Sequence, residues 1–245
     1  MATLRVACAL MEAGARARVA HNYSAMVAVG LGAERHELRI GYGSMDVTVS
    51  SGLNTITRML EVGEKGVNQR LDLEIRALAA SMKARGLTPQ ATVAELERLQ
   101  RETPQHPVWV VALAVGVACA AFGRLFGVDW LAFAPIVAAG AIGQALRRYL
   151  LHCGHNLFVV AGTVAFFSAL VGGIGARAAG SGTVGLAMIA SVLLLVPGIP
   201  SINALYDIME GRPTLGAARA VTVAMLMIFI ALGVWIAQAL LGLRT

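Results

Sequence analysis

Residues 191–207 read Ser191-Val-Leu-Leu-Leu-Val-Pro-Gly-Ile-Pro-Ser-Ile-Asn-Ala-Leu-Tyr-Asp207, and most of them belong to a window of 29 residues, 178–206, that carries no charge. An apolar window of this length can cross a lipid bilayer as a helix. Pro197 and Pro200 must break or kink that helix, because proline removes a backbone donor and clashes with the preceding turn. Broken helices at membrane depth are tolerated where they pack against protein or line a cavity, which is the usual setting of a transport site.

The composition of the whole chain also indicates a membrane protein. Of its 245 residues, 57% are hydrophobic and 14% are charged, whereas soluble domains carry about 25% charged residues. Residues 1–107 hold 13 Lys/Arg and 11 Asp/Glu, but residues 108–245 hold only 7 Arg and 3 acidic residues. We therefore predict a polytopic α-helical membrane protein with a small cytoplasmic α+β domain in residues 1–107 and a five-helix transmembrane domain in residues 108–245.

The pattern of residues 1–107 predicts helices around a small sheet. Apolar residues recur at helical spacing between Leu4 and Gly30, which indicates one or two amphipathic helices. Residues 38–49 alternate as in a β-hairpin, and residues 54–62 are rich enough in Thr and Ile to form a third strand. Two further helices are expected, one along the apolar stripe of residues 71–82 and one that begins at Thr88-Pro89.

Five uncharged runs beyond residue 107 are candidates for transmembrane helices. They are Val108–Gly123, Trp130–Leu146, Leu157–Ala176, Ala178–Tyr206 and Ala220–Leu243. Arginines in the second and fourth connections, with Arg98 and Arg101 before the first run, favour a cytoplasmic N-terminus and an external C-terminus by the positive-inside rule. Glycines within the runs predict tight helix packing.

The broken segment supplies the candidate substrate-binding residues. They are Pro197, Gly198, Pro200, Asn203, Asp207 and Arg219. In one interpretation, the freed backbone groups and the side chains of Asn203 and Asp207 contact a polar solute, while Arg219 neutralises an anionic substrate or pairs with Asp207. In the other, the segment is a short loop between two spans, and Glu210 and Arg212 fit that interpretation better.

Other kinds of chemistry find little support in the sequence. His152, Cys153 and His155 stand too close together, without a second pair of ligands, to match a zinc site. The net charge of +6 comes mainly from arginines between apolar runs, so we predict no nucleic-acid binding. No HExxH, GxSxG or Walker pattern is present. We predict no enzymatic activity, no metal and no cofactor.

Several of these segments together carry a resemblance to a known family. They are the stretch 191–207 followed by Gly211 and by Gly216-Ala-Ala-Arg219, the run Pro107–Phe122, and in the N-terminal region Gly14-Ala15, Leu31-Gly32 and Gly66-Val-Asn68. With these motifs the chain resembles the threonine/serine exporter (ThrE) superfamily, and most closely its short YjjP-type subunits. The resemblance covers nearly the whole chain.

The resemblance implies an exporter of small carboxylates in the cell inner membrane. Full-length relatives export threonine and serine, and the split YjjP/YjjB pair exports succinate. Because the predicted spans end after the fifth, the resemblance also implies a YjjB-type membrane subunit, the C-terminal half of the exporter, as partner.

Three hypotheses follow. In the first, the chain is a subunit of a secondary exporter, in which Asn203 and Asp207 bind the solute or a proton and Arg219 attracts a carboxylate. In the second, it is a regulatory or scaffolding membrane subunit whose cytoplasmic domain controls a partner that forms the path. The third, an intramembrane hydrolase, ranks last because Asp207 is the only candidate for a reactive group at depth.

Overall fold

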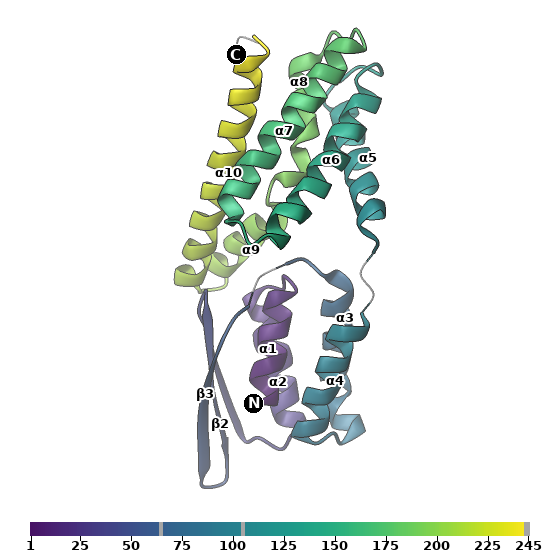
Figure 1. Ribbon diagram of the computed structural model, residues 1–245. Coiled ribbons are helices and arrows are strands. Elements are labelled where there is room, and N and C mark those ends of the chain that lie inside the picture. Colours follow the sequence, from purple (N-terminus) through teal and green to yellow (C-terminus); the bar gives the residue numbers. More distant parts are fainter. Residues whose placement is uncertain (64–65, 104–105, 243–245) are drawn as a thin grey trace. The chain divides into compact units, whose positions relative to one another are not determined.

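The structure is a computed structural model that describes residues 1–63, 66–103 and 106–242. The chain divides into two compact units (Figure 1). Unit 1 comprises Met1–Pro104 and Ile199–Val221, and unit 2 comprises Gln105–Gly198 and Thr222–Thr245. Residues 199–221 therefore group with the N-terminal region, whereas the sequence led us to expect them in a transmembrane domain of residues 108–245.

Unit 1 contains helices and a three-stranded antiparallel sheet of order β1-β2-β3. Its elements are α1 (Ala2–Glu12), α2 (Ala17–Gly30), β1 (Arg35–Ile40), β2 (Ser44–Ser51), β3 (Asn54–Glu61), α3 (Gln69–Arg85), α4 (Pro89–Glu102) and α9 (Gly198–Met209), with the first turns of α10 (Pro213–Leu240). The predicted hairpin, third strand and helices are all present. Thr88 caps α4 as expected, because its hydroxyl accepts from the backbone N–H of Ala91 at 3.2 Å.

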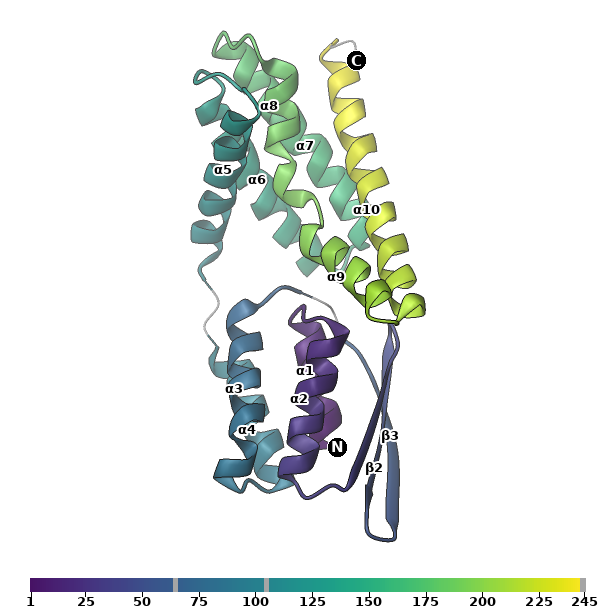
Figure 2. The same ribbon diagram turned by 180° about the vertical axis from the view of Figure 1, so that it is seen from behind.

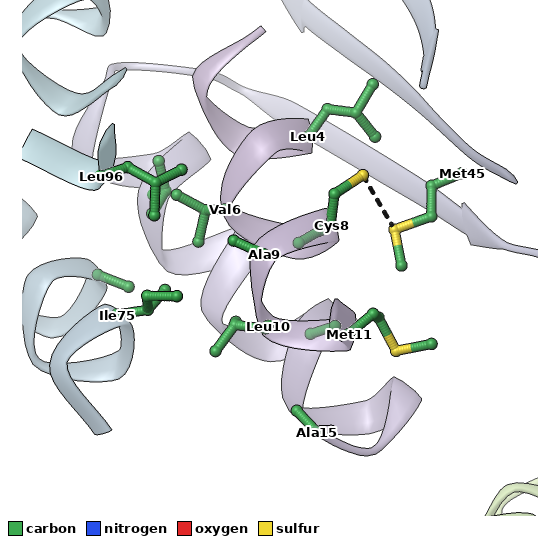
Figure 3. Close-up of a cluster of buried hydrophobic side chains, with 14 of the residues drawn as sticks. Leu4, Val6, Cys8, Ala9, Leu10, Met11, Ala15, Met45, Ile75 and Leu96 are labelled. Carbon is green, nitrogen blue, oxygen red and sulfur yellow. Dashed lines mark hydrogen bonds between the residues drawn. The ribbon is translucent and has the colours of Figure 1, made fainter. Parts of the chain in front are cut away.

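The first helix, α1, forms the centre of unit 1. Figure 3 shows Cys8 on one side of α1, directed at Met45 of β2, with their sulfur atoms 3.7 Å apart. Ile75 of α3 and Leu96 of α4 lie on the other side. Although we expected amphipathic helices here, α1 is buried on nearly every face, because the sheet, α3 and α4 surround it.

Unit 2 is a bundle of apolar helices. It comprises α5 (Val108–Leu125), α6 (Phe133–His152), α7 (Leu157–Ala178), α8 (Val184–Ser191), the short 3₁₀ helix η1 (Leu193–Leu195) and the remainder of α10. Glycines bring the helices together, as predicted: a Cβ added at Gly116 of α5 would overlap the Val137 carbonyl of α6, and one at Gly233 of α10 would overlap the Gly162 carbonyl of α7. Gly182 and Gly185 face open space instead.

Three helices among the described residues, α5, α7 and α10, are long and apolar enough to cross a membrane. A fourth span is possible by the same criterion if α8 and η1 are taken together with α9, from which they are bent by 58° (Figure 2). The predicted second span coincides with α6, which carries Arg147 and Arg148 in its last turns. These arginines keep the mean hydropathy of α6 below that of α5, α7 and α10. The described residues thus contain three to four candidate spans, whereas the sequence predicted five.

Candidate substrate-binding site at the helix break

The expected break in the apolar helix is present. The α8 helix ends at Ser191, η1 follows, and Val196 is extended with φ −60° and ψ 123° before α9 begins at Gly198. Pro197 directly precedes α9 and Pro200 lies in its first turn, where the missing N–H groups would have no partner within the helix. The two prolines therefore end one helix and start the next.

Asp207 of α9 and Arg219 of α10 form a buried ion pair. The Asp207 Oδ2 atom lies 2.7 Å from the Arg219 NH1 atom, and the two residues are 0% and 7% exposed. Gly211, with a φ of +80°, allows the tight turn that folds α10 back toward α9. Taking both charges out of water is costly, so each depends on the other within unit 1.

The ion pair also holds the corner between α1 and α2. The other Asp207 carboxylate oxygen accepts from the backbone N–H of Ala17, the first residue of α2, at 3.4 Å. The N-cap residue of α2, Arg16, makes no side-chain capping bond. Asp207 thus places a negative charge at the free N-terminus of α2, where the helix dipole favours it.

Asn203 lies one turn before Asp207 on the same face of α9. Its Nδ2 atom donates to the Gly14 carbonyl at 3.0 Å. Met11, at the end of α1, contacts Arg219 through its sulfur, which lies 3.4 Å from the NH2 atom. Three side chains of α9 and α10 therefore contact one short stretch of the N-terminal region, from Met11 to Ala17.

Charged and aromatic side chains surround this contact. The Arg16 guanidinium lies over the Tyr206 ring, 4.1 Å from its centroid. Glu210 forms ion pairs with Arg18 and Arg212. The distances from its carboxylate oxygens to their NH1 atoms are 3.7 Å and 3.4 Å. Because the Arg18 side chain is 67% exposed, its pair contributes little to stability.

The structure brings three of the six predicted site residues together: Asn203, Asp207 and Arg219. Pro197, Gly198 and Pro200 lie at the start of α9, where they set the break. Residue types could not predict that the backbone groups of Gly14 and Ala17 would be their partners, since every residue type carries the same backbone carbonyl and nearly every one the same N–H. The φ of +94° at Gly14 reflects the sharp corner that presents these groups.

The arrangement restricts what the site can bind. Asp207 and Arg219 neutralise each other, so an anionic solute that reaches Arg219 must compete with the Asp207 carboxylate. A cation or proton that reaches Asp207 must likewise compete with Arg219. Among residues 1–63, 66–103 and 106–242, no group of three or more His, Cys, Asp or Glu side chains could hold a metal ion.

Comparison with known proteins places the chain in a family. The family model described as "Putative threonine/serine exporter" matches residues 2–241. The chain belongs to the threonine/serine exporter family. It is 28% identical over 244 residues to the "Probable succinate transporter subunit YjjP" of Klebsiella aerogenes, covering 98% of this chain and 94% of that protein. The protein of the same name from Escherichia coli K12 is 28% identical over 239 residues, covering 96% and 91%.

No solved structure matches the chain significantly. Membership of an exporter family, together with the apolar helices of unit 2, α9 and α10, confirms a membrane transport protein. The family also indicates a transport role for this chain rather than a catalytic one.

Proposed function

We propose that this chain is a subunit of a secondary exporter that moves small carboxylates, of the succinate or threonine/serine type, out of the cytoplasm. The observation that carries the proposal is the family match over residues 2–241, joined to a buried Asp–Arg pair between α10 and α9, the helix that follows the break. A YjjB-type membrane subunit completes the transport path. The chain lies in the cell inner membrane with five spans, α6 included, and its N-terminus is cytoplasmic.

In this proposal Arg219 binds the carboxylate of the substrate. Asp207 pairs with Arg219 between transport events, in the position that the substrate carboxylate takes during transport. Arginine suits the role because its planar guanidinium binds a carboxylate through two parallel hydrogen bonds. Asp207 keeps the buried guanidinium neutralised while no substrate is present. When a solute carboxylate takes its place, Asp207 is left free to bind a proton.

Protonation of Asp207 after the exchange of partners at Arg219 would also weaken the contact with the α1–α2 corner, because a neutral carboxyl accepts more weakly than a carboxylate. Asp207 and Asn203 hold this corner through the Ala17 N–H and the Gly14 carbonyl. A change in either side chain therefore alters how α9 contacts the N-terminal helices of unit 1. Pro197, Gly198 and Pro200 separate α9 from α8, so that α9 can change its contacts without a change in α8.

The direct test is efflux of preloaded succinate and threonine from cells that express this chain alone, a YjjB-type partner alone, or both. We expect efflux only when both chains are present. Succinate efflux would assign the dicarboxylate branch, and threonine efflux would assign the amino-acid branch. Equal efflux from cells with and without this chain would contradict the proposal.

One observation favours a second candidate, a regulatory subunit. Residues 199–221, which include Asn203, Asp207 and Arg219, group with Met1–Pro104 and contribute Leu215 to the same apolar core. The polar contacts would then transmit the state of the N-terminal region to a path formed by the partner. In that case Arg219→Lys would leave the apparent KM for solute unchanged, whereas a carboxylate-binding Arg219 predicts a higher KM.

A further inference from the structure

A small cavity of about 10 Å³ lies within unit 2, where α5, α6 and α7 pack around α8 and η1. Its size is about that of one water-sized sphere. Four polar side chains line it, Cys119 of α5, Gln144 of α6, Ser168 of α7 and Ser191 of α8. Cys119, Gln144 and Ser168 each lie near the middle of their helices, at the depth where discontinuous-helix transporters hold their ions.

Two of these side chains lack a protein partner. Ser168 is 2% exposed, and within the described part of the chain neither its hydroxyl nor the Gln144 amide makes a hydrogen bond. Ser191 is 3% exposed and donates to the Ala187 carbonyl at 2.8 Å. Donation uses its hydrogen and leaves the oxygen able to bind a further group. Ser168 is buried and Gln144 is half-buried, and a buried polar group is rarely left without a partner, so we expect a group in the cavity to bond to them.

Glycines preserve the space around both hydroxyls. A Cβ added at Gly143 of α6 would overlap the Ser168 Oγ atom. A Cβ added at Gly172 of α7 would likewise overlap the Ser191 Oγ atom. Any larger residue at these two positions would displace the hydroxyls from the cavity.

The interrupted helix adds negative partial charge to the same place. Ser191 is the last residue of α8, and its carbonyl oxygen receives a long contact from the Cys119 thiol at 3.9 Å. The last carbonyl groups of a helix lack helical partners and form the negative end of its dipole. A cation is therefore favoured over an anion beside Ser191.

We propose that this cavity binds one dehydrated monovalent cation of the size of Na⁺, through the oxygen atoms of Gln144, Ser168 and Ser191. The oxygens are neutral and no Asp or Glu is among the described residues that line the cavity, which suits a single positive charge better than a divalent ion. The Cys119 thiol is too soft a ligand for such an ion and closes one wall instead. If the proposed export function holds, binding of this ion is coupled to it, together with the proton that Asp207 binds.

Sodium binding can be tested on the purified full-length chain without any transport assay. Thermal unfolding is measured in NaCl, KCl and choline chloride at constant ionic strength, for the wild type, Ser168→Ala and Gln144→Met. Thr163→Val is the matched control, because it removes a hydroxyl from α7 outside the cavity lining. Binding of radioactive Na⁺, and its displacement by unlabelled Na⁺ or K⁺, is measured on the same samples.

We expect Na⁺ at ten times its Kd to raise the Tm of the wild type and of Thr163→Val by about 3–6 °C relative to choline. Ser168→Ala and Gln144→Met should lose most of that rise and at least tenfold in Na⁺ affinity. The proposal is overturned if K⁺ raises the Tm as much as Na⁺, if no Na⁺-specific rise occurs in the wild type, or if both variants keep it. Na⁺ binding without solute efflux would refute the exporter proposal alone, and efflux without Na⁺ binding would refute the cation site alone.

Discussion

Asp207 satisfies two buried groups at once, the Arg219 guanidinium and the first N–H of α2. Removal of the Asp207 carboxylate leaves the Arg219 charge and the N-terminus of α2 without partners. The loss of folding free energy therefore exceeds that of an ordinary surface substitution. The same pairing explains how two ionisable side chains between the apolar runs 178–206 and 220–243 can both be buried.

We predict that Asp207→Ala lowers the free energy of unfolding by about 3–5 kcal/mol, since it strands Arg219 without its partner. The double variant Asp207→Ala with Arg219→Met should recover part of that loss, because no unpaired charge remains. Denaturant unfolding of the purified chain measures both values. Glu37→Gln, at an exposed position of β1, is the control and should change little. Strictly additive losses in the double variant would contradict the account.

The free energy of unfolding of unit 1 depends on pH through His36. Burial lowers the pKa of the His36 imidazole, and the nearby His21 lowers it further, while the Ser24 hydroxyl lies 2.9 Å from the His36 Nε2 atom. The unfolded chain, with a His pKa of about 6.5, then binds more protons than the folded one. Stability from His36 is therefore fully present above about pH 6.5 and is lost as the pH falls through its lower folded-state pKa.

We accordingly expect the wild type to lose unfolding free energy between pH 7.5 and pH 5.5, and His36→Gln to lose less over the same range. Chemical unfolding at a series of pH values provides the measurement. His106→Gln, at an exposed position, serves as control and should follow the wild type. An unchanged pH slope in His36→Gln would show that another group is responsible.

At the scale of elements, the hairpin of α9 and α10 depends on a close helix approach at Gly216. A Cβ there would lie 2.7 Å from the Ala204 carbonyl oxygen and 2.5 Å from a side-chain carbon of Ile208. We predict that Gly216→Ala costs about 1–3 kcal/mol by overpacking. Gly185→Ala in α8, where a Cβ meets open space, should be neutral or stabilising by up to about 1 kcal/mol. Equal effects in thermal unfolding would contradict this packing.

The elements that the sequence predicted well are those with local causes. The alternation in residues 38–49 and the Thr88-Pro89 start of α4 each depend on neighbours in the chain, and both were confirmed. The break at Pro197 follows from proline chemistry in the same way. The contact of Asp207 with Ala17 could not be predicted, because it joins a side chain to a backbone amide across 190 positions.

At the scale of the whole molecule, the five-span topology with a cytoplasmic N-terminus makes a prediction for Cys153. Cys153 is exposed in the connection between α6 and α7, while Cys8 and Cys119 are buried. In that topology the connection faces the cytoplasm, so a membrane-impermeant maleimide should label Cys153 only after spheroplasts are permeabilised. A cysteine introduced by Leu131→Cys, in the preceding connection, should be labelled in intact spheroplasts. Labelling of Cys153 in intact spheroplasts would show that the chain has the opposite orientation or fewer than five spans.

Carboxylate binding by Arg219 and the need for both subunits can be measured together as succinate and threonine flux from proteoliposomes that contain this chain and a YjjB-type partner. Wild type, Arg219→Lys and the matched Arg212→Lys are compared at equal protein content. We expect carboxylate flux that requires both subunits, is unchanged in Arg212→Lys and shows a raised KM in Arg219→Lys. Flux from the partner alone at the full rate, or equal KM values in all three forms, would contradict it.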